Sequence, residues 1–101
     1  MLEDLINTMN EQARKLEALG HTVLFDLGDD GKVLLDATGE KVVITPEPED
    51  NEAETTLILS LDNMVKLIGG DLNPMVAFTM GKLKVIGSKG IALKLSSLLE
   101  R

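Results

Sequence analysis

The side chains that could carry chemistry in this chain are few, and their spacing forms no known catalytic pattern. His21 is the single histidine, and there is no cysteine. A cysteine–histidine pair is therefore impossible, and a serine–histidine pair would have to be assembled from serines far away in the sequence. We interpret His21 as an ordinary residue at the start of a strand, which leaves a small hydrolase as the weakest of the alternatives.

Acidic pairs occur at Asp29-Asp30 and Glu49-Asp50, in turn and loop contexts that favour short polar residues for backbone reasons. Asp26 together with Asp29 and Asp30 lacks the fixed ligand spacing of a calcium loop. The glycines never form a phosphate-binding Gly-x-Gly-x-x-Gly or Walker sequence. We therefore expect no catalytic residues, no metal site and no cofactor, and a binding module becomes the default.

The composition predicts one packed domain over residues 1–101, with a core of aliphatic side chains. Hydrophobic residues make up 44% of the 101 residues, yet there are only two Phe and no Tyr or Trp. The absence of cysteine fits a reducing compartment. The first residues resemble no signal peptide, and no apolar run approaches the roughly 20 residues of a membrane span. We expect a cytoplasmic protein.

Charge is unevenly placed along the chain. The formal charge of −7 argues against a nucleic-acid partner, and residues 47–54 hold five acids and no base. The C-terminal fifth is basic, with Lys82, Lys84, Lys89, Lys94 and Arg101 against Glu100. This basic face is either solvated surface or a source of weak, transient attraction to an anionic membrane surface or lipid head group.

The hydrophobic spacing predicts an α+β fold. Residues 2–19 carry apolar positions at three- and four-residue intervals, typical of an amphipathic helix that ends at Gly20. Period-two alternation then predicts strands at 21–27, 33–37, 41–45, 55–61 and 82–85, with an exposed acidic loop from Pro46 to Asn51. Helices are expected from 62 to 68, from Asn73-Pro74 onward, and after Gly87 to the end.

One segment carries a specific pattern. Residues 70–87 contain Gly-Asp-Leu-Asn-Pro, then Ala-Phe, then Gly-Lys-Leu-Lys and a closing glycine. This resembles the signature of the sterol carrier protein 2 family, which reads Gly-x-x-Asn-Pro-x-x-Ala-Phe-x-x-Gly-Lys-Leu-Lys-x-x-Gly. Phe25-Asp26-Leu27 and the run from Thr55 to Asp62 are also similar, so the resemblance covers roughly residues 20–99.

The resemblance implies a five-stranded, mostly antiparallel sheet covered by helices, with an apolar tunnel between sheet and helices. Carried onto matching positions, it implies ten ligand-binding candidates in the second half of the chain. They are Met64, Leu67, Ile68, Met75, Phe78, Met80, Leu83, Val85, Ile91 and Leu95. Each of these residues would serve equally well as ordinary core, so the pattern alone leaves both roles open.

The implied function is non-catalytic binding and carriage of a lipid-like molecule, of fatty acyl, isoprenoid or sterol type. The alternative is an accessory or scaffold subunit that docks a partner protein or enzyme, or forms a homodimer, through the same groove. An apolar pocket of about 300 Å³ left empty would cost about 7 kcal/mol, close to the whole stability of a small domain. We therefore expect the pocket to be filled by lipid or closed by movement of the last helix.

The chain ends in Leu98-Leu99-Glu100-Arg101, without the Ser-Lys-Leu type of peroxisomal signal that many eukaryotic members of the family carry. It also stands alone, whereas related domains are often fused to enzymes. We therefore expect a prokaryotic, cytoplasmic protein. In that setting an acyl or isoprenoid chain is a better candidate ligand than a sterol.

Overall fold

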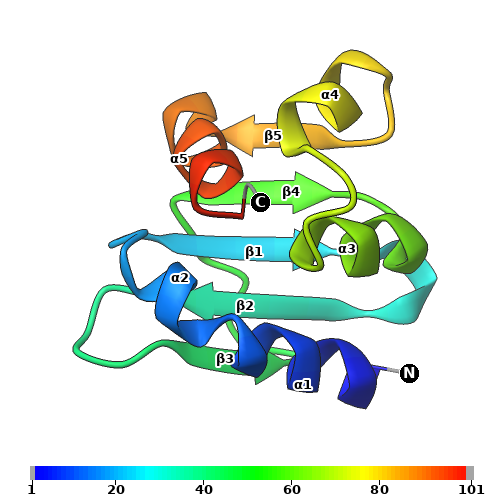
Figure 1. Cartoon of the computed structure of the whole chain (residues 1–101). Coiled ribbons are helices and arrows are strands. Elements are labelled where there is room, and N and C mark those ends of the chain that lie inside the picture. Colours follow the sequence, from blue (N-terminus) through cyan, green and yellow to red (C-terminus); the bar gives the residue numbers. More distant parts are fainter. Residues whose placement is uncertain (1, 100–101) are drawn as a thin grey trace.

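A mixed β-sheet with helices on one face forms the framework of the computed structural model, which describes residues 2–99 (Figure 1). Within those residues the sheet has five strands in the spatial order β3-β2-β1-β4-β5. Their bounds are Thr22–Asp26 for β1, Lys32–Asp36 for β2, Val43–Pro46 for β3, Thr55–Ile58 for β4 and Lys84–Gly87 for β5. The predicted α+β fold with a mostly antiparallel sheet is confirmed.

The exception to the antiparallel pattern is the central pair. β1 and β4 run parallel, with Phe25 opposite Leu57, while the other three pairings are antiparallel. Parallel strands need a crossover connection rather than a tight turn. The connection from β1 to β4 runs through β2 and β3, and residues 47–54 complete it by crossing behind the sheet, on the face away from the helices (Figure 1).

The helices share the front of the sheet (Figure 1). Their bounds are Leu2–Glu11 for α1, Ala13–Glu17 for α2, Leu61–Ile68 for α3, Pro74–Thr79 for α4 and Lys89–Leu99 for α5. The continuous first helix predicted over residues 2–19 is wrong in one respect, because the helix breaks at Gln12. Its backbone has φ −96° and ψ 7°, outside the helical region. The break lets α1 pack on α3 and β3 while α2 packs on α5.

The core lies between the helices and the front of the sheet. Val23 and Phe25 of β1 face it with no exposed surface, as do Val33 and Leu35 of β2 and Leu57 of β4. Inward residues alternate with outward ones along the strands, although Leu24 of β1, which points to the opposite face, is buried as well. The radius of gyration is 11.9 Å, slightly below the roughly 13 Å typical of 100 residues. The interior is thus compact and almost wholly aliphatic.

Candidate functional site

Six of the ten candidate ligand-binding residues lie in the hydrophobic core. They are Met64, Leu67, Ile68, Leu83, Ile91 and Leu95, each at most 7% exposed. Val85 is partly buried and packs against the same cluster. The resemblance therefore selected a group of side chains that the fold brings together, between α3, α5 and the sheet. We call these seven residues the inner group.

Local sequence sets the inward face of α3. Ser60 caps the helix by accepting a hydrogen bond from the Asn63 backbone N–H at 3.1 Å. Met64, Leu67 and Ile68 then follow at three- and four-residue spacing, which places all three on one side of the helix. This side faces the sheet, and the exposed Val65 lies on the other.

The inner group is closed in this structure. Met64, Leu67 and Leu95 have no surface accessible to a water molecule, so no void large enough for water lies against them. The space between sheet and helices is therefore filled by side chains at these positions. Such close packing is the ordinary state of a protein interior, and a tunnel at this place requires the layers to separate.

The remaining three candidates lie outside this cluster. Met80 is 60% exposed, Phe78 is 36% exposed, and Met75 is half-buried. The reason is that α4 buries its two small residues, Pro74 and Ala77, against the domain. Met75 and Met80 instead line a surface pocket of about 250 Å³, together with Val76 and Thr79. We call Met75, Phe78 and Met80 the outer group.

Side chains outside the ten candidates complete the interior. Phe25 and Leu57 supply the sheet side, and Leu5 and Met9 of α1 supply a second wall. The alternating pattern of the strands and the helical spacing of residues 2–19 already carried this signal. The resemblance implied ligand-binding candidates only from residue 64 onward, so these four residues were not among them.

A polar pocket of about 540 Å³ lies at the start of α5. It is lined by His21, Glu54, Ser88, Gly90, Ile91 and Lys94. The Ser88 hydroxyl oxygen accepts a hydrogen bond from the Ile91 backbone N–H at 3.2 Å, which caps the helix. Ile91 is 7% exposed and belongs to the inner group. The first turn of α5 therefore separates the polar pocket from the apolar core.

His21 and Glu54 join β1 to β4 beside this pocket. His21 Nδ1 lies 3.1 Å from both carboxylate oxygens of Glu54. The Thr22 backbone N–H donates to the same carboxylate at 3.0 Å, and the Glu54 N–H donates in return to the Thr22 hydroxyl. The hydrogen bond from Thr22, followed by that from His21, holds the pKa of Glu54 below its ordinary value of 4.5.

His21, interpreted from the sequence as an ordinary residue at the start of a strand, is hydrogen-bonded to Glu54, a contact that the sequence did not predict. The two residues are 33 positions apart and meet only because β1 and β4 pair in parallel. Within residues 2–99, no three His, Cys, Asp or Glu side chains are grouped so that they could hold a metal ion. Every helix in that range is too short or too polar to cross a bilayer.

A mixed sheet covered by helices, with an aliphatic interior, places the chain among the α+β domains. The model of the SCP-2 sterol transfer family matches residues 2–100. The chain belongs to this family.

Known relatives agree in sequence and in fold. Rat sterol carrier protein 2 is 34% identical over 71 residues, which is 70% of this chain but 13% of the rat protein. The apo structure of sterol carrier protein 2 from Yarrowia lipolytica is 25% identical with a TM-score of 0.66, covering 87% of this chain and 73% of that one. The Aedes aegypti sterol carrier protein 2 in complex with palmitate is 20% identical with a TM-score of 0.65, covering 91% and 94%.

Proposed function

We propose that this domain binds one lipid-like apolar molecule between α3, α5 and the sheet, and carries it without chemical change. The observation that carries the proposal is the inner group, seven family-matched candidates gathered in one aliphatic layer. Membership of the SCP-2 sterol transfer family supports it, as does palmitate in the similarly folded Aedes protein. A fatty acyl or isoprenoid chain is the preferred ligand, and a sterol is the third class to be tested.

Entry of a ligand requires the closed layer to open, and α5 is the element proposed to move. It follows Gly87, whose φ of +103° needs a glycine, and it has Gly90 in its first turn. The polar pocket lies on its outer side, so its first turn has room on one flank. Displacing Ile91 and Leu95 together would uncover the inner group while leaving the five-stranded sheet intact.

The test is native mass spectrometry of the purified protein, run beside organic extraction of the same preparation. A stoichiometric acyl, isoprenoid or sterol species in both measurements is the expected result, and it names the ligand class. If the purified protein is empty, it should take up added fatty acid or acyl-CoA at one molecule per chain. A protein that is empty and takes up none of these would contradict the carrier function.

The same native spectra address the alternative role as an accessory subunit. A subunit that docks a partner through its apolar surface would remain free of lipid and would instead appear as a dimer or as a complex with another protein. A carrier should appear as a lipid-bound species whose bound mass disappears on organic extraction. The two outcomes differ in the mass that is added to the chain, so a single preparation separates them.

A further inference from the structure

The outward side of α4 is an apolar surface without a partner in this structure. Val76 is 51% exposed and Met80 is 60% exposed, and Met75 lies with them around the surface pocket. Thr79 is the polar residue on this face, and its hydroxyl already donates to the Met75 carbonyl at 3.0 Å. The side chains of this face could therefore be buried without leaving a side-chain hydrogen-bond donor unsatisfied. We call Met75, Val76, Thr79 and Met80 the α4 face.

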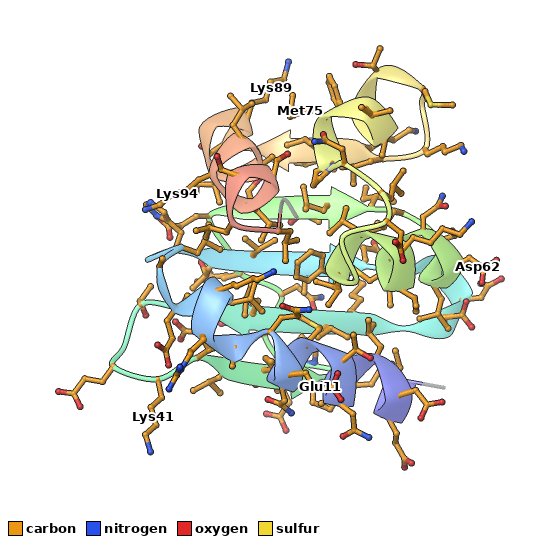
Figure 2. The ribbon with its side chains drawn as sticks, viewed as in Figure 1. Glu11, Lys41, Asp62, Met75, Lys89 and Lys94 are labelled. Carbon is orange, nitrogen blue, oxygen red and sulfur yellow. The ribbon has the colours of Figure 1, made fainter. Side chains whose placement is uncertain are left out.

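Basic side chains flank the α4 face. Lys89 lies with its Nζ 5.5 Å from the centre of the Phe78 ring. Figure 2 shows Lys89 at the start of α5 and Met75 on α4. Lys82 comes three residues after the end of α4, and its backbone N–H donates to the Ala77 carbonyl at 2.8 Å. Residues 72–99 contain four lysines and no acid, although the whole chain has a net charge of −7. Two of these lysines are close to the exposed apolar side chains of α4, since Lys82 follows Met80 by two residues and Lys89 lies over Phe78.

We propose that the α4 face docks on an anionic phospholipid bilayer. Exposed Met and Val side chains would enter the boundary between head groups and acyl chains, while Lys82 and Lys89 contact the phosphates. The surface potential of an anionic bilayer strengthens adsorption about fivefold for each lysine near it. A net negative protein would be repelled in any other orientation, so the local charge also selects the docked face.

This inference rests on the proposed carrier function, to which it gives a place for ligand exchange. α4 packs directly on α5, the helix proposed to open. Docking through α4 would therefore bring the opening edge of the inner group against the bilayer. A lipid could then pass between membrane and protein without crossing open water, where its apolar surface would be exposed.

The first experiment measures partitioning of the full chain onto phosphatidylcholine vesicles with and without 30 mol% phosphatidylserine. Val76→Glu is the test variant, and Val65→Glu is its matched control because Val65 is also a helical valine, 46% exposed, but on α3. We expect the wild type to prefer the anionic vesicles, Val76→Glu to lose about tenfold in partitioning, and Val65→Glu to bind like the wild type. Equal loss in both variants, or no preference for anionic vesicles, would overturn the proposal.

A second measurement does not depend on disrupting the surface. The chain has no cysteine, so Val76→Cys and Val65→Cys each offer one site for an environment-sensitive fluorophore. On anionic vesicles the label at position 76 should shift to the blue and that at position 65 should not. The shift should shrink as salt rises, because the Debye length falls from about 10 Å at 0.1 M to about 3 Å at 1 M. Identical spectra at the two positions would overturn the proposal. A blue shift at position 76 that appears only when another protein binds, and not with vesicles, would overturn it as well.

Fatty-acid uptake in the absence of vesicles keeps this inference separate from the carrier function. Val76→Glu should take up palmitate in solution to the same stoichiometry as the wild type, because Val76 belongs to the α4 face and not to the inner group. Uptake without anionic vesicle binding would defeat the docking proposal alone. Vesicle binding by a protein that takes up no palmitate would contradict the carrier function, while the proposal that α4 docks on the bilayer would still hold.

Discussion

The side-chain oxygen of Asn73 links the start of α4 to the middle of α5. It accepts hydrogen bonds from the backbone N–H groups of Met75 and Val76, at 2.8 and 3.2 Å, and lies 3.4 Å from the hydroxyl of Ser96. Pro74 follows at the first helical position, where a backbone N–H would have no partner within the helix, so proline loses no hydrogen bond there. The Asn-Pro pair of the family pattern thus has a structural role, since it caps one helix and attaches it to the next.

Asn73→Ala should lower the free energy of unfolding by about 1 kcal/mol, the typical loss when an asparagine cap is replaced by alanine. The contact with Ser96 would be lost as well, so the change should loosen α4 against α5. Urea unfolding followed by circular dichroism gives the free energy. Asn51→Ala, in the exposed loop, is the control and should change stability by less than about 0.5 kcal/mol. Equal losses for the two variants would mean that the cap has no special role.

Gly87→Ala should be more destabilising than Gly81→Ala, although both glycines belong to the same sequence pattern. Both have positive φ, +103° and +75°. A Cβ at Gly87 would lie 2.7 Å from the Glu54 carbonyl oxygen and 3.2 Å from the Thr55 Cα, whereas a Cβ at Gly81 meets nothing within 4 Å. We expect about 1–2 kcal/mol for Gly81→Ala from backbone strain alone.

The loss for Gly87→Ala should exceed that value, because the obstructing atoms are backbone and cannot rotate away. Thermal unfolding of both variants under one condition provides the comparison. A smaller loss at Gly87 than at Gly81 would show that β5 can shift away from β4. That result would also weaken the case for a sheet that stays intact while α5 moves.

Acid should remove the contribution of the Glu54 carboxylate to stability. Its pKa is lowered in the folded protein by hydrogen bonds from Thr22 and His21. The ionised form is therefore favoured by folding, and this contribution is complete above the ordinary pKa of 4.5 and disappears as the pH falls through the lowered value. Glu54→Gln should be less stable than the wild type at pH 7, with a difference that shrinks toward pH 3.

Urea unfolding midpoints of wild type and Glu54→Gln, measured between pH 7 and pH 3, check this prediction. Glutamine keeps one oxygen that can accept from the Thr22 N–H, but it loses the charge and one of the two oxygens near His21. Two midpoint curves that run parallel over the whole range would contradict a folded-state preference for the ionised carboxylate. Asp36 should add a similar acid sensitivity to both proteins, since hydrogen bonds from the Thr38 hydroxyl and backbone N–H lower its pKa.

Local patterns in the sequence were enough to predict most elements and much of the inner group. Asn73-Pro74 started a helix as expected, and the helix expected from 62 to 68 is present as α3, with Met64, Leu67 and Ile68 buried and Val65 exposed. The parallel pairing of β1 with β4 left no local signal, because it depends on where the 47–54 crossover leads. The hydrogen bond between His21 and Glu54 follows from that pairing and likewise had no local signal.

Two further features, the break in the first helix and the orientation of α4, were not predicted from the sequence for a different reason. Gln12 interrupts the first helix without the glycine or proline that usually marks such a break. In α4 the large apolar residues face outward and the small ones inward, the reverse of what hydrophobicity alone suggests. Alanine and proline allow α4 to lie close to the domain, and this leaves Phe78 and Met80 at the surface. A sequence pattern reports which residues are apolar, but not which of them the packing will cover.

Truncating Leu95 should tell whether a ligand lies against α5. Leu95 has no exposed surface, and Leu95→Ala should lose about 2–5 kcal/mol of stability by leaving a cavity in the inner group. A bound acyl chain can fill that cavity, so saturating palmitate should raise the melting temperature of Leu95→Ala more than that of the wild type. The size of the rise follows from the affinity, since a ligand that binds only the folded state stabilises it by RT ln(1 + [L]/Kd).

Leu35→Ala is the matched control, because Leu35 is equally buried but lies on β2, outside the inner group. It should lose stability by a similar amount, while palmitate should shift its melting temperature no more than it shifts that of the wild type. The comparison separates local filling by the ligand from general stabilisation of a weakened protein, because both variants start from similar stability. If palmitate raised the melting temperatures of both variants equally, the ligand would not lie against Leu95, and the inner group would be core without a binding role.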